Sequence, residues 1–137
     1  MIMDAYLLMS DSQNLTAVAS ATASTSYIDT VAAGDDYAGA WYVMNVETAL
    51  TSATTSNTLT FALQSDSTTA FSTATTHISS GALGSATMVA GYTFKARIPT
   101  GLKRYVRVLM TPVSTISTGI VSNFIVKDAD VNMQLVA

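Results

Sequence analysis

The distribution of apolar and polar residues along the chain predicts an all-β protein. Short apolar, β-branched or aromatic runs alternate with clusters of Ser, Thr, Gly and Asp at fairly regular intervals, and helical periodicity is weak. The candidate strands are 6–9, 14–18, 26–29, 41–46, 58–64, 75–78, 92–98, 103–111 and 120–127. This pattern favours an antiparallel two-sheet sandwich of jelly-roll type with about eight strands over an up-and-down barrel, although periodicity alone does not separate these topologies.

Two of these runs predict which side chains face the core. From Leu59 to Leu63 the odd positions are large and apolar, as in a half-buried antiparallel strand. In residues 41–47 the even positions, Tyr42, Met44 and Val46, form the more apolar set. Trp41 then lies on the opposite face, where an aromatic residue is either a plug at the strand end or an interface anchor.

The length of 137 residues is that of one domain. We expect residues 1–127 to form a single jelly-roll domain. Residues 128–137 follow as a C-terminal tail or an edge strand, because their apolar residues alternate after two aspartates. A tail that reaches onto a neighbouring subunit is an equal alternative.

Composition narrows the partners that this chain can have. Charged residues make up 11% of the chain, against about 25% in a typical soluble domain, so small polar residues or an assembly must cover the surface. The net charge of −3 argues against nucleic acid as a partner.

No run is apolar for long enough to span a bilayer, and the N-terminus lacks the basic region of a signal sequence. The chain has no cysteine, which excludes disulfides and thiolate metal sites. We therefore expect a protein made in the cytoplasm, with no membrane partner.

The basic residues are concentrated in one stretch. The first 94 residues contain no lysine or arginine, and five of the six basic residues then follow within a short segment. They are Lys95, Arg97, Lys103, Arg104 and Arg107. Residues 99–101, Pro-Thr-Gly, predict a turn that joins two strands.

Such a hairpin would place Lys95, Arg97, Lys103, Tyr105 and Arg107 on one face. Because like charges across strands repel each other, acidic groups should lie opposite this face. They belong either to a partner protein or to the chain itself, in which case Arg104 and Arg107 pair with its own aspartates. Composition alone leaves both alternatives open.

The residue types that commonly carry out catalysis or bind metals are scarce in this chain. His77 is the only histidine, and its strand-like surroundings favour a surface or edge histidine over a Ser-His-Asp arrangement. Asp35 and Asp36 lie in a glycine-bounded loop that is either a calcium site or, as we favour, a solvated turn. We predict no catalytic, cofactor-binding or metal-binding residues, and no enzyme activity.

The order of several short motifs resembles that of the small jelly-roll capsid cement, or decoration, proteins of tailed bacteriophages. These motifs are Leu7-Leu8, Ser10-Asp11, Trp41-Tyr42-Val43, Leu63-Gln64-Ser65-Asp66, Ala70-Phe71-Ser72, Val89-Ala90-Gly91-Tyr92-Thr93-Phe94, Ile98-Pro99-Thr100-Gly101, Arg104-Tyr105-Val106-Arg107-Val108 and Thr118-Gly119-Ile120-Val121. Together they extend over most of the chain. The resemblance implies a structural virion protein without catalytic residues.

The resemblance also implies partners and a location. Such a protein is a homotrimer on the outer surface of the phage head, where it stabilises contacts between subunits of the major capsid protein. It would be synthesised in the host cytoplasm. The alternative is another virion module, such as a head-fibre, tail or glycan-binding sandwich, in which Tyr27, Tyr37, Trp41 and Tyr92 surround one groove.

We assign the protein interface to the basic segment, to Trp41 and to the N-terminus. The residues are Lys95, Arg97, Lys103, Arg104, Tyr105, Arg107, Trp41, Met1, Ile2 and Met3. Tyrosine and arginine beside apolar residues are enriched at protein interfaces, which supports this choice.

Overall fold

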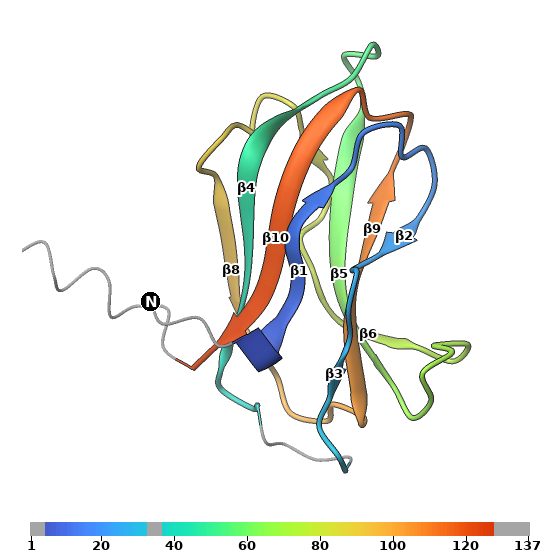
Figure 1. Cartoon of the computed structure of the whole chain (residues 1–137), viewed down its shortest axis with the longest axis vertical. Helices are drawn as coiled ribbons and strands as arrows, with labels where there is room; N and C mark the ends of the chain where they lie inside the picture. Colours follow the sequence, from blue (N-terminus) through green and yellow to red (C-terminus); the bar gives the residue numbers. More distant parts are fainter. Residues whose placement is uncertain (1–4, 33–36, 128–137) are drawn as a thin grey trace, which may run out of the picture.

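Two antiparallel sheets packed face to face form the part of the chain that the computed structural model describes, residues 5–32 and 37–127 (Figure 1). These residues contain no α-helix, and their one helical element is the 3-10 turn η1 (Ala5–Leu7). The strands are β1 (Leu8–Asn14), β2 (Thr22–Ala23), β3 (Ile28–Asp29), β4 (Trp41–Thr51), β5 (Thr58–Asp66), β6 (Thr75–Ser79), β7 (Leu83–Gly84), β8 (Thr93–Arg97), β9 (Tyr105–Pro112) and β10 (Thr118–Val126). The predicted all-β sandwich is confirmed, with ten strands instead of about eight because the two-residue strands β2 and β7 lie in segments where no strand was predicted.

The strand order is that of a jelly roll. One sheet has the order β1-β10-β4-β8, and the other has the order β2-β9-β5-β6, with β3 paired to β9 and β7 paired to β5. All of these pairings are antiparallel. Neighbouring strands are mostly far apart in the sequence, as in interlocked Greek keys.

The core lies between the sheets and follows the predicted alternation. Leu59, Phe61 and Leu63 of β5 are at most 1% exposed. The even positions of β4 from Tyr42 to Val46 are fully buried in the same cluster. Since side chains of a strand alternate between faces, the odd positions of β4 point away from this core.

A chain of buried polar groups crosses the core near β1. The Tyr42 hydroxyl donates to Asn123 Oδ1 over 2.7 Å, and Asn123 Nδ2 donates to Ser10 Oγ over 3.3 Å. Ser10 Oγ in turn donates to Gln13 Oε1, and Gln13 Nε2 donates to the carbonyl of Ala23 in the other sheet. This network joins the sheets where β1 leads into β2, and it satisfies groups that would be costly to bury unpaired.

The N-terminal strands differ from the prediction. The predicted strands 6–9 and 14–18 are replaced by η1 and one strand, Leu8–Asn14. Residues 15–18 form a turn instead, in which Ala17 has a φ of +67°. The amide of Leu15 donates to the carbonyl of Gly119 at the start of β10, and that of Ala17 donates to the carbonyl of Ile116 in the connection before this strand.

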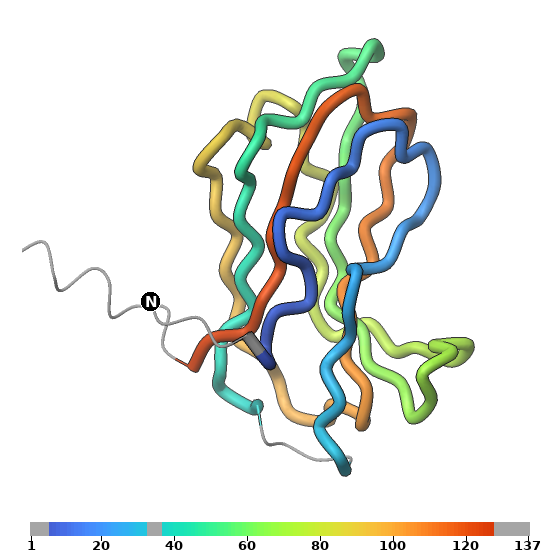
Figure 2. The backbone as a smooth tube through the Cα atoms, viewed as in Figure 1, coloured from blue at the N-terminus to red at the C-terminus, as the bar shows by residue number. Residues whose placement is uncertain are grey.

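The predicted basic hairpin is wrong. Strand β8 pairs with β4 in the four-stranded sheet, whereas β9 pairs with β5 in the six-stranded sheet. Figure 2 shows residues 98–104 crossing between the sheets at one end of the sandwich. Ile98 and Leu102 are 2% and 3% exposed, so both ends of the Pro-Thr-Gly segment are held in the core and the chain does not turn back on itself.

Candidate protein interaction surfaces

The basic residues of the predicted hairpin are divided between the outer faces of two sheets. Lys95 and Arg97 are exposed on β8, next to Trp41 and Val43 of β4. Arg107 and Tyr105 lie half-buried on β9, on the side opposite the core residues Val106 and Val108. The alternation of basic and apolar residues predicted for each strand is therefore confirmed, but a single cationic face is not formed.

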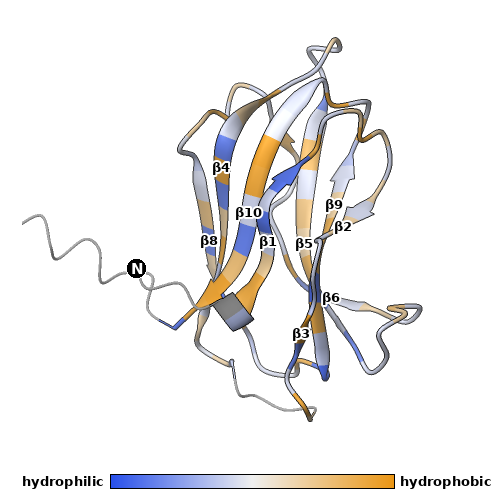
Figure 3. Ribbon diagram, in the orientation of Figure 1, coloured by the Kyte–Doolittle hydropathy of each residue, from blue (hydrophilic) through white to orange (hydrophobic). Residues whose placement is uncertain are grey.

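The outer face of the four-stranded sheet carries a second apolar cluster. Val43, Phe124 and Val126 are buried together there, with Leu8 and Trp41 packed against them. Figure 3 shows the hydrophobic end of β10 that takes part in this cluster. Trp41 thus lies opposite Tyr42, as predicted.

Arg97 covers the ring of Trp41 at the edge of this cluster. Its Cζ lies 4.9 Å from the ring centroid, and its Nη1 donates to the carbonyl of Gly39 over 3.2 Å. An arginine held over an indole by a backbone carbonyl presents a cation and an apolar surface at one place. We call Leu8, Trp41, Val43, Arg97, Phe124 and Val126 the tryptophan surface.

The outer face of the six-stranded sheet carries an arginine and aromatic cluster drawn from distant parts of the chain. The ring of Tyr27 contacts those of Phe71 and Tyr105 edge to face, with centroid distances of 6.2 Å and 5.7 Å. Arg104 lies 4.9 Å from the Tyr105 ring centroid, and Arg107 lies 4.4 Å from that of Phe71. We call these five residues the tyrosine surface.

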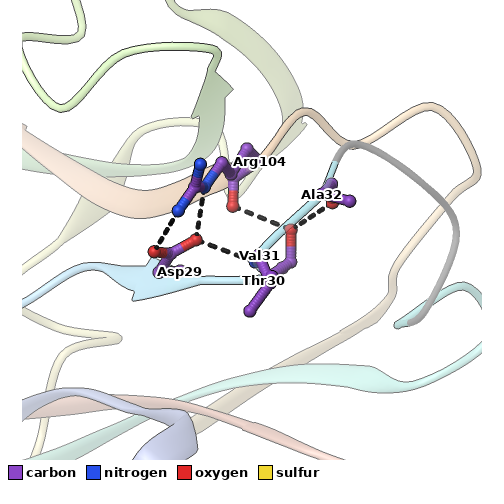
Figure 4. A network of polar contacts seen from close by, with 5 residues as sticks. All are labelled: Asp29, Thr30, Val31, Ala32 and Arg104. Carbon is purple, nitrogen blue, oxygen red and sulfur yellow. Dashed lines mark hydrogen bonds and ion pairs between the residues drawn. The ribbon is translucent and has the colours of Figure 1, made fainter.

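Arg104 pairs with an aspartate of its own chain, as one of the two alternatives predicted. Its Nε and Nη2 donate to the two carboxylate oxygens of Asp29 over 2.8 Å and 3.0 Å (Figure 4). The hydrogen bond from Arg104 lowers the pKa of Asp29, and the amide of Val31 contributes in the same direction. The pair fixes the end of β3 against the start of β9, where the amide of Thr30 also donates to the Arg104 carbonyl.

Arg107 is bound differently. Its Nε donates to Gln64 Oε1 over 3.2 Å, and within residues 5–32 and 37–127 it forms no ion pair. Burial lowers the pKa of Arg107, and the negative charge of Asp66 partly offsets this shift. Asp66 itself accepts hydrogen bonds from Ser67 and Thr73 of the following loop. The alternative in which Arg107 pairs with an aspartate is therefore wrong for the described residues.

His77 forms a hydrogen bond that its sequence position did not predict. Its Nε2 lies 2.7 Å from Ser65 Oγ, which also accepts the amide of Lys103. Burial, and then the charge of Lys103, lower the pKa of His77, so its ring is neutral near pH 7. Ser65 is fully buried, so its hydroxyl is not accessible as a nucleophile. The pair ties β5 and β6 to the crossing segment.

The four aromatic residues predicted to surround a groove do not come together, and other predicted residues lie outside the described part of the chain. Tyr27 belongs to the tyrosine surface, Trp41 lies on the other sheet, and Tyr37 and Tyr92 pack partly buried against the core, so these four do not surround one groove. Met1, Ile2 and Met3, the aspartates Asp35 and Asp36, and residues 128–137 lie outside the described residues.

Across residues 5–32 and 37–127, no three His, Cys, Asp or Glu side chains are grouped so that they could hold a metal ion. The same residues contain no helix that is long and apolar enough to cross a bilayer.

Sequence reasoning missed Tyr27 and Phe71 as members of one surface. Phe71 was the lone aromatic residue in a Ser/Thr-rich segment, 65–76, and this is the signal that could have marked it. Tyr27 carried no such signal, because its partners lie more than forty residues away along the chain.

Comparison with known protein families identifies the family to which the chain belongs. A family model described as Bbp16 matches residues 9–125, from β1 into β10, and so includes both sheets. The chain belongs to the Bbp16 family. Bbp16 is a phage-associated protein family, so the phage association predicted from the sequence is confirmed at this level. No curated protein matches the chain.

Proposed function

We propose that this Bbp16 protein is a structural virion protein that cements the phage head. In this proposal it binds the outer surface of the capsid as a homotrimer and stabilises contacts between subunits of the major capsid protein. It is synthesised in the host cytoplasm and acts without a cofactor, nucleic acid or membrane. Binding is its whole activity, and it is not an enzyme.

One observation carries the proposal. Each of the three arginines in the chain lies over an aromatic ring on the outer side of a sheet. Arginine and large aromatic residues are the side chains most enriched at the centres of protein interfaces. Because the tryptophan and tyrosine surfaces lie on opposite sheets, one subunit has two separate places at which to contact other polypeptides.

These two surfaces suit a cement protein in particular. A subunit of a trimer must bind its own copies and, at another place, the coat. Three copies joined in one particle then multiply modest contacts with the coat into tight attachment. We assign the tryptophan surface to contacts between copies, because the partly exposed Trp41 and the exposed Arg97 lie there beside an apolar cluster. The tyrosine surface, with more polar groups, is assigned to the coat.

The test is binding to heads of the phage that carries the gene. Heads lacking the protein are mixed with purified protein and sedimented, and the bound fraction is measured against heads that already contain it. The proposal expects saturable binding to the first sample and little to the second. Sedimentation equilibrium of the free protein should give three times the monomer mass of 14.3 kDa. A monomer that leaves the heads uncoated would refute the proposal.

A further inference from the structure

The tyrosine surface borders a cavity of about 140 Å³. One wall is the segment 23–27, which includes the half-exposed Tyr27, and the other wall is formed by Thr69 and Phe71 from the loop after β5. Arg107 of β9 also lines the cavity. The cavity therefore joins three segments that are distant in the sequence.

Both walls are held in place by hydrogen bonds. The amide of Ser24 donates to Val108 over 2.7 Å, and the amide of Ser26 donates to Met9 over 2.8 Å. On the other side, Asp66 accepts the amides of Ser67 and Thr73 over 2.6 Å and 2.9 Å, which closes the loop that carries Thr69 and Phe71. A site fixed before binding loses less entropy when a ligand enters.

Phe71 adopts a backbone conformation that non-glycine residues rarely take. Its φ is +50°, and its side chain is only 7% exposed beneath Arg107. Such conformations persist where the surrounding structure determines them, and they gather at functional sites. In this conformation the centroid of the ring lies 4.4 Å from Arg107 Cζ.

Arg107 still has hydrogen-bond donors to offer. A guanidinium has five N–H groups, and among the described residues only its Nε donates, to Gln64. The hydroxyls of Ser26 and Thr69, which line the same cavity, donate to no group in the described part of the chain. A half-buried guanidinium with free forked donors is matched best by a carboxylate.

We propose that this cavity receives an aspartate or glutamate side chain of a partner protein, whose carboxylate binds the free Nη groups of Arg107. This inference rests on the proposed cement function, in which the partner is the coat. A carboxylated sugar is less well matched, because sugars stack on exposed ring faces. Here Arg107 covers Phe71, which is only 7% exposed, so the ring face of Phe71 is not open for stacking.

The first test uses small probes and isotope-labelled protein. N-acetyl-glutamate amide, N-acetyl-glutamine amide and methyl glucuronide are titrated separately, and amide and Arg107 Nε shifts are followed by NMR. The glutamate probe should shift residues 23–27, Thr69, Phe71 and Arg107 at millimolar concentration, with at least tenfold weaker binding of the glutamine probe. Tighter binding of the glucuronide, or no binding of the glutamate probe, would overturn the proposal.

Two variants locate the binding. Arg107→Gln should weaken binding of the glutamate probe at least tenfold, whereas Lys127→Gln, which removes a positive charge from an exposed position just after β10 and outside both surfaces, should leave it unchanged. Thr69→Glu places a carboxylate beside Arg107 from an exposed loop position and should block the probe, while Thr69→Gln should block it less. Equal binding by Thr69→Glu and wild type would contradict the proposal even if Arg107→Gln fails to fold.

Binding to phage heads separates this inference from the function on which it rests. If wild-type protein coats heads and both Arg107→Gln and Thr69→Glu coat them equally well, the cavity does not hold a coat side chain and the cement function stands. If wild-type protein does not coat heads, the cement function fails, and the coat is excluded as the source of the carboxylate. A loss of at least tenfold in both variants supports the proposal.

Discussion

The guanidinium of Arg97 lies over the indole of Trp41, 4.9 Å from the ring centroid, on the outer face of the four-stranded sheet. The two residues pair across β4 and β8, and Trp41 also packs against the buried cluster of Val43, Phe124 and Val126. An aromatic residue in this setting is suited to be the centre of an interface.

Replacing Trp41 with alanine should therefore disrupt assembly. Truncation of a central interface residue costs about 2 kcal/mol or more of binding free energy, which corresponds to a loss of more than tenfold in affinity between copies. Sedimentation velocity over a concentration series measures this loss. Val113→Ala, at a 72% exposed position outside both surfaces, is the matched control. A trimer of unchanged stability in Trp41→Ala would show that the tryptophan surface does not join the copies.

The stability of the protein should decrease as the pH is lowered, because of His77. Its pKa is lowered in the folded protein, so the unfolded chain binds the proton more readily. The contribution of the neutral ring is complete above the ordinary pKa of about 6.5 and is lost as the pH falls toward the lower folded value. Urea unfolding at fixed protein concentration should thus show lower stability at pH 5 than at pH 7.5.

The variant His77→Gln isolates this effect, since His77 is the only histidine. Glutamine has an acceptor for the Ser65 hydroxyl but does not titrate. The stability of the His77→Gln variant should change little between pH 7.5 and 5. The carboxyl groups of Asp29, Glu47 and Asp66, whose pKa values are lowered in the folded protein, stay ionised in this range. The same pH dependence in the variant and the wild type would assign the effect to other groups.

Tyr42→Phe should destabilise the sandwich without changing its shape. The hydroxyl is fully buried, and it is the donor to Asn123 Oδ1. A buried acceptor left without its donor costs about 1–3 kcal/mol. Urea unfolding measures the loss, with Tyr92→Phe as the control because Tyr92 is only partly buried against the core. Equal stability of the two variants would mean that the Tyr42 hydroxyl contributes nothing.

Arg104→Gln should loosen the end of β3. The carboxylate that Arg104 holds also accepts the amide of Val31 over 2.8 Å, so hydrogen exchange at Val31 should quicken. The pKa of Asp29 should rise toward its ordinary value when the arginine is removed, which carboxyl NMR shifts can follow. Arg97→Gln should alter neither quantity. An unchanged Asp29 titration would rule out the bidentate pair in solution.

The regular alternation of the long strands made much of the fold predictable. In β5 and in the first half of β4, one apolar face meets the core, and a period of two in the sequence follows directly from that burial. The outward position of Trp41 was predictable for the same reason.

The pairing of strands was not predictable from the same signals. Pro99 to Gly101 have turn chemistry, but Ile98 and Leu102 on either side are buried between the sheets, and that long-range packing decides the path. The tyrosine surface likewise depends on Tyr27, Phe71 and Tyr105 meeting in three dimensions. Whether Arg104 or Arg107 would pair internally depended on the position of Asp29, which only β3 pairing with β9 sets.

Image reconstruction of phage heads tests the cement function most directly. Heads are imaged before and after addition of the purified protein, and the difference density is fitted with the sandwich. We predict new density on the outside of the shell at threefold positions, with three sandwiches in each and their tyrosine surfaces toward the coat. Absence of added density on the outer shell at saturating protein would contradict the account.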